Sequence, residues 1–358
     1  SAQQADAARS RPRSHMTVEG ADESKVPICV VVVNYRTPSM VIDCLRTVVP
    51  QVRESGGRVA LVDNASPDDS VERLSRWIDD NDAKDVIELI ASESNGGFAA
   101  GNNIGIQSCD ADFYLLLNSD TLLEDAAISR LLARASTDPD SGLISPRLQW
   151  PDGTPQESCF RFHRPVSELI DGAATGPVTQ LLSRYDVPIP VEDADSFPEW
   201  TSFACVLIRA EVFVDVGLLD EGFFMYFEDS EFCARARDTG WRVLHHPEAR
   251  VVHLRGGSSP VKSQARAKKR LPRYFYESRT RYFYERYGRR GLLAANLLWT
   301  LGWSLSSVRA ALQSRYQSPA CEAQWRDIWI RFWDPLGPYT HPSGEATPRR
   351  TPQARQRR

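Results

Sequence analysis

Strand-like and helix-like segments alternate four times between residues 27 and 136, and no other feature of the sequence constrains the fold as strongly. The expected strands are short and apolar, and they are residues 27–35, 58–63, 85–92 and 112–120. Helical spacing or helix-starting residues follow each of them, at residues 38–51, 66–80, 98–109 and 125–136, with Ser66 as the expected N-cap of the second helix. This alternation predicts an α/β domain with a mostly parallel sheet.

Polar residues close the first two expected strands, at the end where parallel sheets bind ligands. Asn34 and Tyr35 end the first strand, and Asp63 and Asn64 end the second. A carboxylate at Asp63 can accept hydrogen bonds from a nucleobase or ribose, although the following "NASPDDS" is equally typical of a turn. These residues are candidates for contacting a nucleotide, and a turn residue is the alternative for Asp63.

The third and fourth expected strands also end in candidate residues. The loop Asn95-Gly96-Gly97 is either a phosphate-binding segment or a tight turn, because glycines let a backbone approach a phosphate closely and a helix N-terminus favours negative charge. Asp120 follows three leucines and Asn118-Ser119. It is placed either to hold a hard divalent cation together with a nucleotide diphosphate or to cap the next helix.

Three residues in the second half of the chain carry chemistry of their own. Glu228 and Asp229 follow the aromatic-rich "EGFFMYF". Low dielectric and mutual repulsion can raise the pKa of one of two adjacent acids so that it works as a base, whereas the alternative is the acidic first turn of a helix. His253 ends the second of two short strands expected within residues 241–254, and it is either a metal or phosphate contact or a structural histidine.

Several protein classes are disfavoured by what the sequence lacks. The turn after the first expected strand, "NYRTPSM", contains no glycine, so it fits neither the dinucleotide-binding G-x-G-x-x-G nor the P-loop pattern. Seven cysteines include no C-x-x-C pair, which favours free thiols in a reducing compartment and offers no zinc-site spacing. The polar first 25 residues are unlike a secretory signal.

Charge is divided unevenly along the chain. Residues 250–358 contain 22 Lys/Arg and 6 Asp/Glu, a net charge of +16, whereas the preceding residues carry −20 and the whole chain −4. Within the basic part, residues 291–308 carry no charge, and Leu297, Leu301 and Leu305 recur at helical spacing. This favours a helix lying on an anionic membrane surface; a packed helix is the alternative, and the polar residues make a spanning helix a poor fit.

Six motifs, in their order along the chain, resemble an inverting glycosyltransferase of family 2. They are "VVVNYRTPSMVIDCLRTV", "LVDNASPDDS", "NGGFAAGNNIGI", "LLLNSDT", "LDEGFFMYFEDSEFCARARDTGW" and "ARVVHLRGGSS". Within the family, this set is similar to bacterial rhamnosyltransferases and related cell-surface polysaccharide enzymes. The resemblance implies the GT-A type of α/β fold, with a mostly parallel central sheet.

The resemblance also implies a role for each candidate residue. The residues expected to bind the nucleotide-sugar are Asn34, Tyr35, Asp63, Asn95, Gly96 and Gly97. Asp120 matches the carboxylate of the family's D-x-D-like motif and, with His253, is expected to bind Mg²⁺ or Mn²⁺. Asp229 matches the general base, supported by Glu228. The motif's first position is Asn118, which removes one negative charge and puts the strength of metal binding in doubt.

The implied reaction is metal-dependent transfer of a sugar, with rhamnose from dTDP-rhamnose favoured, to an acceptor hydroxyl on a lipid-linked or polysaccharide glycan. Asp229 would remove the acceptor's proton, and a single displacement would invert the anomeric centre without a covalent intermediate. The alternatives are a UDP- or GDP-sugar donor, a protein or small-molecule acceptor, a non-catalytic sugar-binding scaffold and a nucleotidyltransferase. No nucleic acid partner is expected.

Four parts of the chain are expected. Residues 1–25 would be a disordered arm or an expression remnant, and residues 26–260 the GT-A domain, with a nucleotide-binding part at 26–145 and an acceptor part at 146–260. Residues 261–336 would form a basic, aromatic helical extension, and residues 337–358 a disordered tail. Residues 166–198 have weak periodicity. The expected location is cytoplasmic, peripheral on the inner face of the cytoplasmic membrane.

Overall fold

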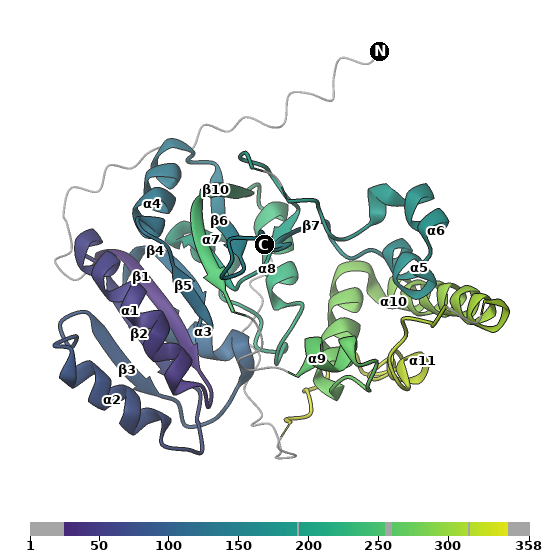
Figure 1. Ribbon diagram of the computed structural model, residues 1–358, viewed down its shortest axis with the longest axis horizontal. Coiled ribbons are helices and arrows are strands. Elements are labelled where there is room, and N and C mark those ends of the chain that lie inside the picture. Colours follow the sequence, from purple (N-terminus) through teal and green to yellow (C-terminus); the bar gives the residue numbers. More distant parts are fainter. Residues whose placement is uncertain (1–24, 192, 255–259, 314–315, 343–358) are drawn as a thin grey trace, which may run out of the picture.

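The structure, a computed structural model, describes residues 25–191, 193–254, 260–313 and 316–342, and the account below concerns these residues. They form a central sheet with helices on both faces, beside a group of C-terminal helices (Figure 1). The strands are β1 (Val26–Asn34), β2 (Arg58–Asp63), β3 (Ile87–Ala91), β4 (Ala111–Asn118), β5 (Thr121–Leu123), β6 (Ser141–Gln149), β7 (Cys159–Phe160), β8 (Trp200–Thr201), β9 (Cys205–Arg209) and β10 (Arg242–His253). The helices are α1 (Pro38–Ser55), α2 (Ser70–Asp80), α3 (Gly97–Ser108), α4 (Ala127–Thr137), α5 (Pro165–Ala173), α6 (Gly176–Leu181), the 3₁₀ helix η1 (Ser183–Tyr185), α7 (Ala210–Val216), α8 (Glu228–Asp238), α9 (Val261–Arg266), α10 (Arg273–Leu312) and α11 (Gln324–Asp327).

The large sheet has the strand order β3-β2-β1-β4-β9-β6-β10-β5. β1 pairs in parallel with β2 and β4, β2 with β3, and β6 with β10, whereas β9 and β5 are antiparallel to their neighbours. Because β9 lies antiparallel between β4 and β6, the strands β1–β4, β6 and β10 all run in one direction. Their carboxyl ends therefore meet at one edge of the sheet, and the predicted mostly parallel sheet is confirmed.

Both faces of the sheet are buried, which explains the continuous apolar run of β1. Ile28, Val30 and Val32 point into one apolar layer with residues of α1, α2 and α4. Cys29 and Val31 point into the other layer with residues of α3, α7 and α8. A strand covered on both sides needs apolar residues at successive positions, so its sequence does not alternate between apolar and polar.

Two expectations about local structure are wrong. Helix α2 begins at Ser70 with Asp69 as its N-cap, and the Ser66 hydroxyl instead accepts a hydrogen bond from the backbone N–H of Arg36. Residues 241–254 form the single strand β10 and not two short strands. Pro247 lacks the N–H that a ladder needs, and a register shift between His246 and Arg250 absorbs this defect while β10 stays paired with β6.

Residues 166–198, whose sequence periodicity is weak, contain the helices α5 and α6 and the turn η1. Helix α5 packs closely on α10. The backbones approach so closely that a Cβ added at Gly172 would lie 2.4 Å from the backbone oxygen of Trp299. The buried ion pair between Glu168 and Arg279, 2.7 Å long, joins the same two helices. The expected boundary between residues 145 and 146 falls inside β6.

The C-terminal extension is helical over most of its described length. Helix α10 bends at Gly288, which adopts a φ of 67° and a ψ of −175°. The expected disordered tail begins at residue 337, and in its first residues, 337–342, Tyr339 and His341 form hydrogen bonds to the loop at residues 95–97. The arm 1–24, residues 255–259 and residues 343–358 lie outside the described residues. Within the described ranges, we find no helix with the length and apolar character needed to cross a bilayer.

Candidate active site

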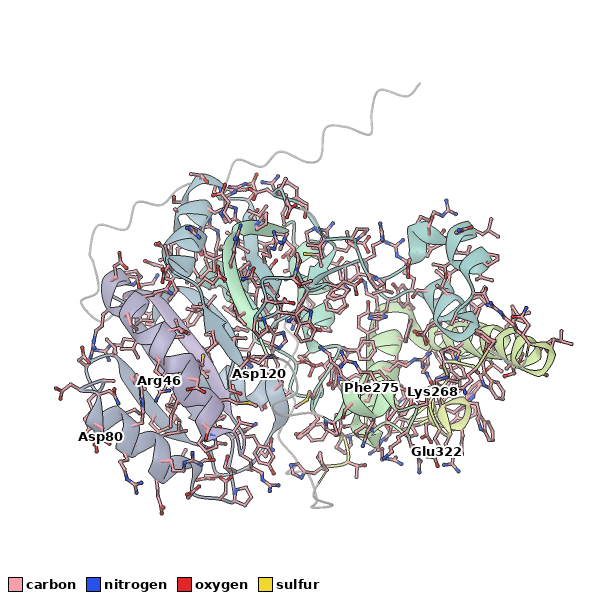
Figure 2. All side chains as sticks on the ribbon, viewed as in Figure 1. Arg46, Asp80, Asp120, Lys268, Phe275 and Glu322 are labelled. Atoms are coloured by element: carbon pink, nitrogen blue, oxygen red, sulfur yellow. The ribbon has the colours of Figure 1, made fainter. Side chains whose placement is uncertain are left out.

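The predicted site residues lie around the carboxyl edge of the sheet. Asn34 and Asp63 end β1 and β2 and are paired in register, and Asp120 lies two residues beyond the end of β4. His253 ends β10, directly opposite Thr121 of β5. Figure 2 shows Asp120 at the lower edge of the sheet, on the side where the C-terminal helices lie. The parallel topology therefore brings residues from four strands to one edge.

Asn34 and Asp63 form a buried polar link between β1 and β2. The Asn34 amide donates to Asp63 Oδ2 at 2.6 Å, and the backbone N–H of Ser66 donates to Asp63 Oδ1 at 2.8 Å. Asp63 is 1 % exposed, so both of its oxygens serve the turn that follows β2. In this structure Asp63 supports a loop of the site, and its contact with a nucleotide base stays a prediction. Tyr35 follows Asn34 and is half-buried.

Asn64, one of the polar residues expected at the strand ends, organises the Asn95-Gly96-Gly97 loop, a role that the resemblance to the family does not assign to it. Its Nδ2 donates to Asn95 Oδ1 at 2.9 Å and to the carbonyl of Gly97 at 3.0 Å. Asn95 Oδ1 also accepts from the backbone N–H of Gly97. Asn64 Oδ1 is buried without a hydrogen-bond partner among the described residues, so it can accept one more hydrogen bond. Its position after Asp63 at a strand end was the available signal.

Gly97 brings this loop into close contact with the backbone of Phe224, in the segment that precedes Glu228 and Asp229. A Cβ at Gly97 would lie 1.9 Å from the carbonyl oxygen of Phe224, and the residue has a φ of +83°. The same Phe224 carbonyl accepts a hydrogen bond from the backbone N–H of Phe98 at 2.8 Å. Glycine is therefore required here both for its backbone conformation and for this close approach.

Asp120 and His253 meet although 133 positions separate them in the sequence. His253 Nε2 lies 3.4 Å from Asp120 Oδ1, and both residues are buried. Neighbouring ligands around an octahedral Mg²⁺-like ion lie about 3 Å apart, so one cation fits between these two atoms after a small adjustment. The described residues contain no group of three or more His, Cys, Asp or Glu side chains that could hold a metal. The pair thus suits a cation whose remaining ligands come from a diphosphate and water.

Glu228 and Asp229 begin helix α8 in surroundings that favour their neutral forms. Burial raises the pKa of Asp229 to about 6, although hydrogen bonds from the backbone N–H groups of Ser230 and Phe203 lower it. Burial and then the charge of Asp229 raise the pKa of Glu228 well above its usual range. Glu228 Oε2 has no hydrogen-bond partner among the described residues. At neutral pH the pair therefore holds one charge, on Asp229.

The backbone immediately before this acid pair is strained. Tyr226 and Phe227 both have positive φ angles, of 72° and 70°, which side-chain-bearing residues seldom adopt. Packing holds them in place, because the Phe227 ring contacts Phe275 and Tyr282 of α10. Strain of this kind is concentrated at functional sites.

Asp229 lies at the same edge of the sheet as Asp120 and His253. Its carboxylate accepts from the backbone of Phe203, and the carbonyl of the next residue, Ala204, accepts the backbone N–H of Asn118 at the end of β4. His163, a residue missed by sequence analysis, lies with its ring centroid 5.1 Å from that of Phe227. Burial lowers the pKa of His163 to about 4, so it is neutral at pH 7. A lone histidine in a poorly periodic segment gives no signal for this position.

The fold is of the GT-A type, and the comparisons with known proteins support a glycosyltransferase. Residues 29–165 match the model described as "Glycosyl transferase family 2". This part of the chain is similar to family 2 glycosyltransferases, and the curated proteins that it resembles include bacterial rhamnosyltransferases. The matched range contains Asn34, Asp63 and Asp120 and stops short of the acid pair and His253.

Two curated relatives and one solved structure give the scale of the similarity. The N-acetylglucosaminyl-diphospho-decaprenol L-rhamnosyltransferase of Mycobacterium tuberculosis is 28% identical over 56% of this chain and 67% of its own length. The low-salt glycan biosynthesis hexosyltransferase Agl10 of Haloferax volcanii is 29% identical over 59% of this chain and 61% of its own length. The fold resembles S. aureus TarS 1–349 in complex with UDP-GlcNAc, with a TM-score of 0.51 and 14% identity over 87% of this chain and 82% of that one.

Proposed function

We propose that this glycosyltransferase moves a sugar from a nucleoside diphosphate to an acceptor hydroxyl with inversion at the anomeric carbon. The observation that carries the proposal is the Asp229 carboxyl, whose pKa of about 6 lets it be ionised at neutral pH and still accept a proton readily. A general base needs a pKa near the working pH, and an ordinary surface aspartate is too weak a base for this task.

The nucleotide-sugar is proposed to lie along the carboxyl edge, between the Asn95–Gly97 loop and Asp120. Asp120 and His253 would hold Mg²⁺ or Mn²⁺, which would neutralise negative charge on the departing diphosphate. Asn118 contributes no charge there, so the protein supplies a single carboxylate. We therefore expect tight metal binding only when the diphosphate of the donor is present.

The proposed chemistry needs one base and no nucleophile from the protein. Asp229 takes the proton from the acceptor oxygen, which attacks the anomeric carbon from the face opposite the diphosphate. Glu228, kept neutral by burial and by its neighbour, leaves Asp229 as the charged member of the pair. A single displacement of this kind inverts the configuration of the anomeric carbon.

The favoured donor is dTDP-rhamnose, and the favoured acceptor is a lipid-linked or polysaccharide glycan. The support is the name of the mycobacterial relative, an L-rhamnosyltransferase whose acceptor is a diphospho-decaprenol glycan, together with the similarity to rhamnosyltransferase WbbL of Escherichia coli. A UDP- or GDP-sugar is the alternative donor.

A thermal-shift screen with dTDP-, UDP- and GDP-sugars in Mn²⁺ tests the proposal, because a ligand that binds the folded state raises the melting temperature. We expect one class of donor to stabilise the wild type in the presence of Mn²⁺ and to lose most of this effect in Asp120→Ala. Asp43→Ala, on the exposed side of α1, is the matched control and should respond like the wild type. The absence of a shift with all three donors would contradict the proposal.

We further propose that the enzyme is peripheral on an anionic membrane. One side of the second half of α10 is apolar and exposed, and its members, with exposed fractions between 39 % and 80 %, are Leu293, Leu297, Leu301, Leu305, Val308 and Leu312. The opposite side, which includes Trp299, is buried. The face extends about 28 Å at the α-helical rise; Arg289 and Arg290 precede it, and Arg309 lies near its C-terminal end.

Sedimentation with anionic liposomes tests the membrane proposal on the full chain. Leu301→Glu/Leu305→Glu should release the protein from phosphatidylglycerol vesicles, because it places two negative charges on the apolar face. Val214→Glu is the matched control, since Val214 is 84 % exposed on α7, away from this face. Equal sedimentation of the double variant and the wild type would refute the proposal.

A further inference from the structure

The last described residues, 337–342, cross the loop that we propose binds the donor, and we call them the strap. The Tyr339 hydroxyl donates to the carbonyl of Gly96 at 3.1 Å. The ring Nε2 of His341 lies 3.1 Å from the carbonyl of Asn95, and because that carbonyl can only accept, Nε2 carries the proton. Two consecutive carbonyl groups of the loop are thus held by residues about 245 positions later in the chain.

The strap is itself attached to helix α10. The backbone N–H of Thr340 donates to Glu277 Oε2 at 2.8 Å, and its hydroxyl donates to Oε1 at 3.0 Å. Glu277 is 5 % exposed and also accepts from Arg273 at 2.8 Å. A buried carboxylate with several donors is a rigid anchor, so the strap links the C-terminal extension to the nucleotide-binding part of the sheet.

Phe224 fixes the strap from the opposite side. Its ring lies 5.2 Å from that of Tyr339 and 5.4 Å from that of His341, measured between centroids. The carbonyl of Phe224 accepts the backbone N–H of Phe98, in the first turn of α3. The loop and the start of α3 are therefore held between Phe224 and the strap. Phe224 itself lies four residues before Glu228 in the sequence.

Holding these carbonyls has a direct consequence for the amide groups of the loop. In a trans peptide the C=O and N–H point in opposite directions, so a carbonyl of Asn95 directed at the strap turns the N–H of Gly96 away from it. In the same way, the Gly96 carbonyl fixes the N–H of Gly97, which donates to Asn95 Oδ1. These are the amides of the N-cap and of the first residue of α3, where a helix attracts negative charge.

We propose that the strap is a positioning element for the donor: Tyr339 and His341 hold the Asn95–Gly97 loop in the conformation that receives the diphosphate of the nucleotide-sugar. This inference rests on the proposed function. It assigns to the C-terminal extension a part in donor binding, because the strap reaches the loop from Glu277 of α10. Tyr339 and His341 are positioning residues, and they act through the loop.

The test uses the full-length double variant Tyr339→Phe/His341→Phe, which keeps both rings against Phe224 and removes both hydrogen bonds. Each lost bond should weaken donor binding about fivefold, so the KM for the donor and the Kd for dTDP-rhamnose with Mn²⁺ should rise about 25-fold in the double variant. The kcat should change less than about twofold. Tyr316→Phe is the matched control, because its hydroxyl contacts the carbonyl of Ala174, in the α5 region.

Hydrogen–deuterium exchange of peptides covering residues 93–101 gives a readout that does not depend on activity. In the ligand-free protein these amides should exchange faster in the double variant and at the wild-type rate in Tyr316→Phe. A wild type that binds dTDP-rhamnose, or UDP-glucose or GDP-mannose in its place, together with a double variant that binds it equally well, would overturn the strap inference and leave the proposed function standing. A wild type that binds none of the three would overturn both.

A lower melting temperature in the double variant without a change in donor Kd would also overturn the inference, because the strap would then only stabilise the fold. Faster exchange of the loop together with a raised donor Kd and an unchanged kcat is the result that the inference predicts.

Discussion

The Asp229→Asn substitution should stabilise the folded protein relative to the wild type, and this difference should grow as the pH rises. The reason is that the substitution removes a carboxyl whose ionisation the fold disfavours. The pKa of Asp229 is raised from 3.8 to about 6. At 1.36 kcal/mol per pKa unit, a rise of about two units costs the folded state about 3 kcal/mol once the carboxyl is ionised. Since the side chain is half-buried and partly screened by solvent, we expect a measured effect of about 1–2 kcal/mol.

The sign follows from the order in which the two states lose the proton. Below about pH 4 the carboxyl is protonated in both the folded and the unfolded chain, so it makes no difference to stability. Between about pH 4 and 6 the unfolded chain ionises first, and the wild type loses stability relative to Asp229→Asn. Above about pH 6.5 the difference should reach its full value.

Urea denaturation of the wild type and Asp229→Asn at several pH values between 4 and 8 measures this difference as a free energy of unfolding. Asp80→Asn is the control, because Asp80 is exposed at the end of α2 (Figure 2) and should show no comparable rise with pH. A difference between Asp229→Asn and the wild type that is the same at pH 4 and pH 8 would refute the reasoning about Asp229. The same variant should lose turnover by about 10²–10⁴-fold if the carboxylate is the base.

Three further predictions concern the Asn95–Gly97 loop, the C-terminal extension, and the pair of Asp120 and His253. Gly97→Ala should destabilise the fold by more than Gly153→Ala in thermal melts, because both glycines have a φ near +82° but only Gly97 meets a backbone oxygen, at 1.9 Å; equal losses would contradict the close approach. Arg279→Ala should cost about 3–5 kcal/mol of unfolding free energy in urea, since it leaves Glu168 buried without its 2.7 Å partner, and a loss below about 1 kcal/mol would be inconsistent with that burial. His253→Ala should weaken Mn²⁺ binding in the presence of a nucleoside diphosphate roughly tenfold or more in calorimetric titrations, and unchanged binding would remove His253 from the metal site.

The sequence predicts β1, β2 and β4 to within two residues, because buried parallel strands are short apolar runs that end in polar residues. The same polar residues predict the edge of the sheet at which we propose the site. Asp120 and His253 are assigned together only through the resemblance to a family, since no spacing rule connects positions so far apart. Their 3.4 Å separation is a result of the strand order, in which β5 pairs with the end of β10.

Other parts of the molecule depend on contacts that sequence patterns do not report. Helix α5 is stabilised by its close contact with α10 around Gly172 and by the buried ion pair between Glu168 and Arg279, and neither contact can be read from the spacing of residues in the sequence. Asn64 is a turn residue by composition, and its role in the Asn95 loop emerges from hydrogen bonds across 31 and 33 positions. The strap looks like a tail in the sequence, because a single tyrosine and a single histidine make its hydrogen bonds to the loop and a single threonine makes those to Glu277.

The apolar face of α10, in contrast, belongs to a helix that the sequence pattern does predict. Its leucine spacing predicts an amphipathic helix, and the structure leaves that face exposed while the other side packs on α5. The pattern could not say which side would be covered, because Trp299 and Leu301 are both apolar and lie on opposite sides of the helix. Burial separates them, with 1 % of Trp299 and 52 % of Leu301 exposed.

The most direct test of the central claim is the release of nucleoside diphosphate from the donor that stabilises the wild type, measured with and without Mn²⁺ between pH 5 and 8. The wild type should turn over the donor with Mn²⁺, and its rate should rise through about pH 6 as Asp229 ionises and then reach a plateau. Asp120→Ala and Asp229→Ala should each lose most of this turnover. Full metal-dependent turnover in both variants would contradict the assignment of these two carboxylates.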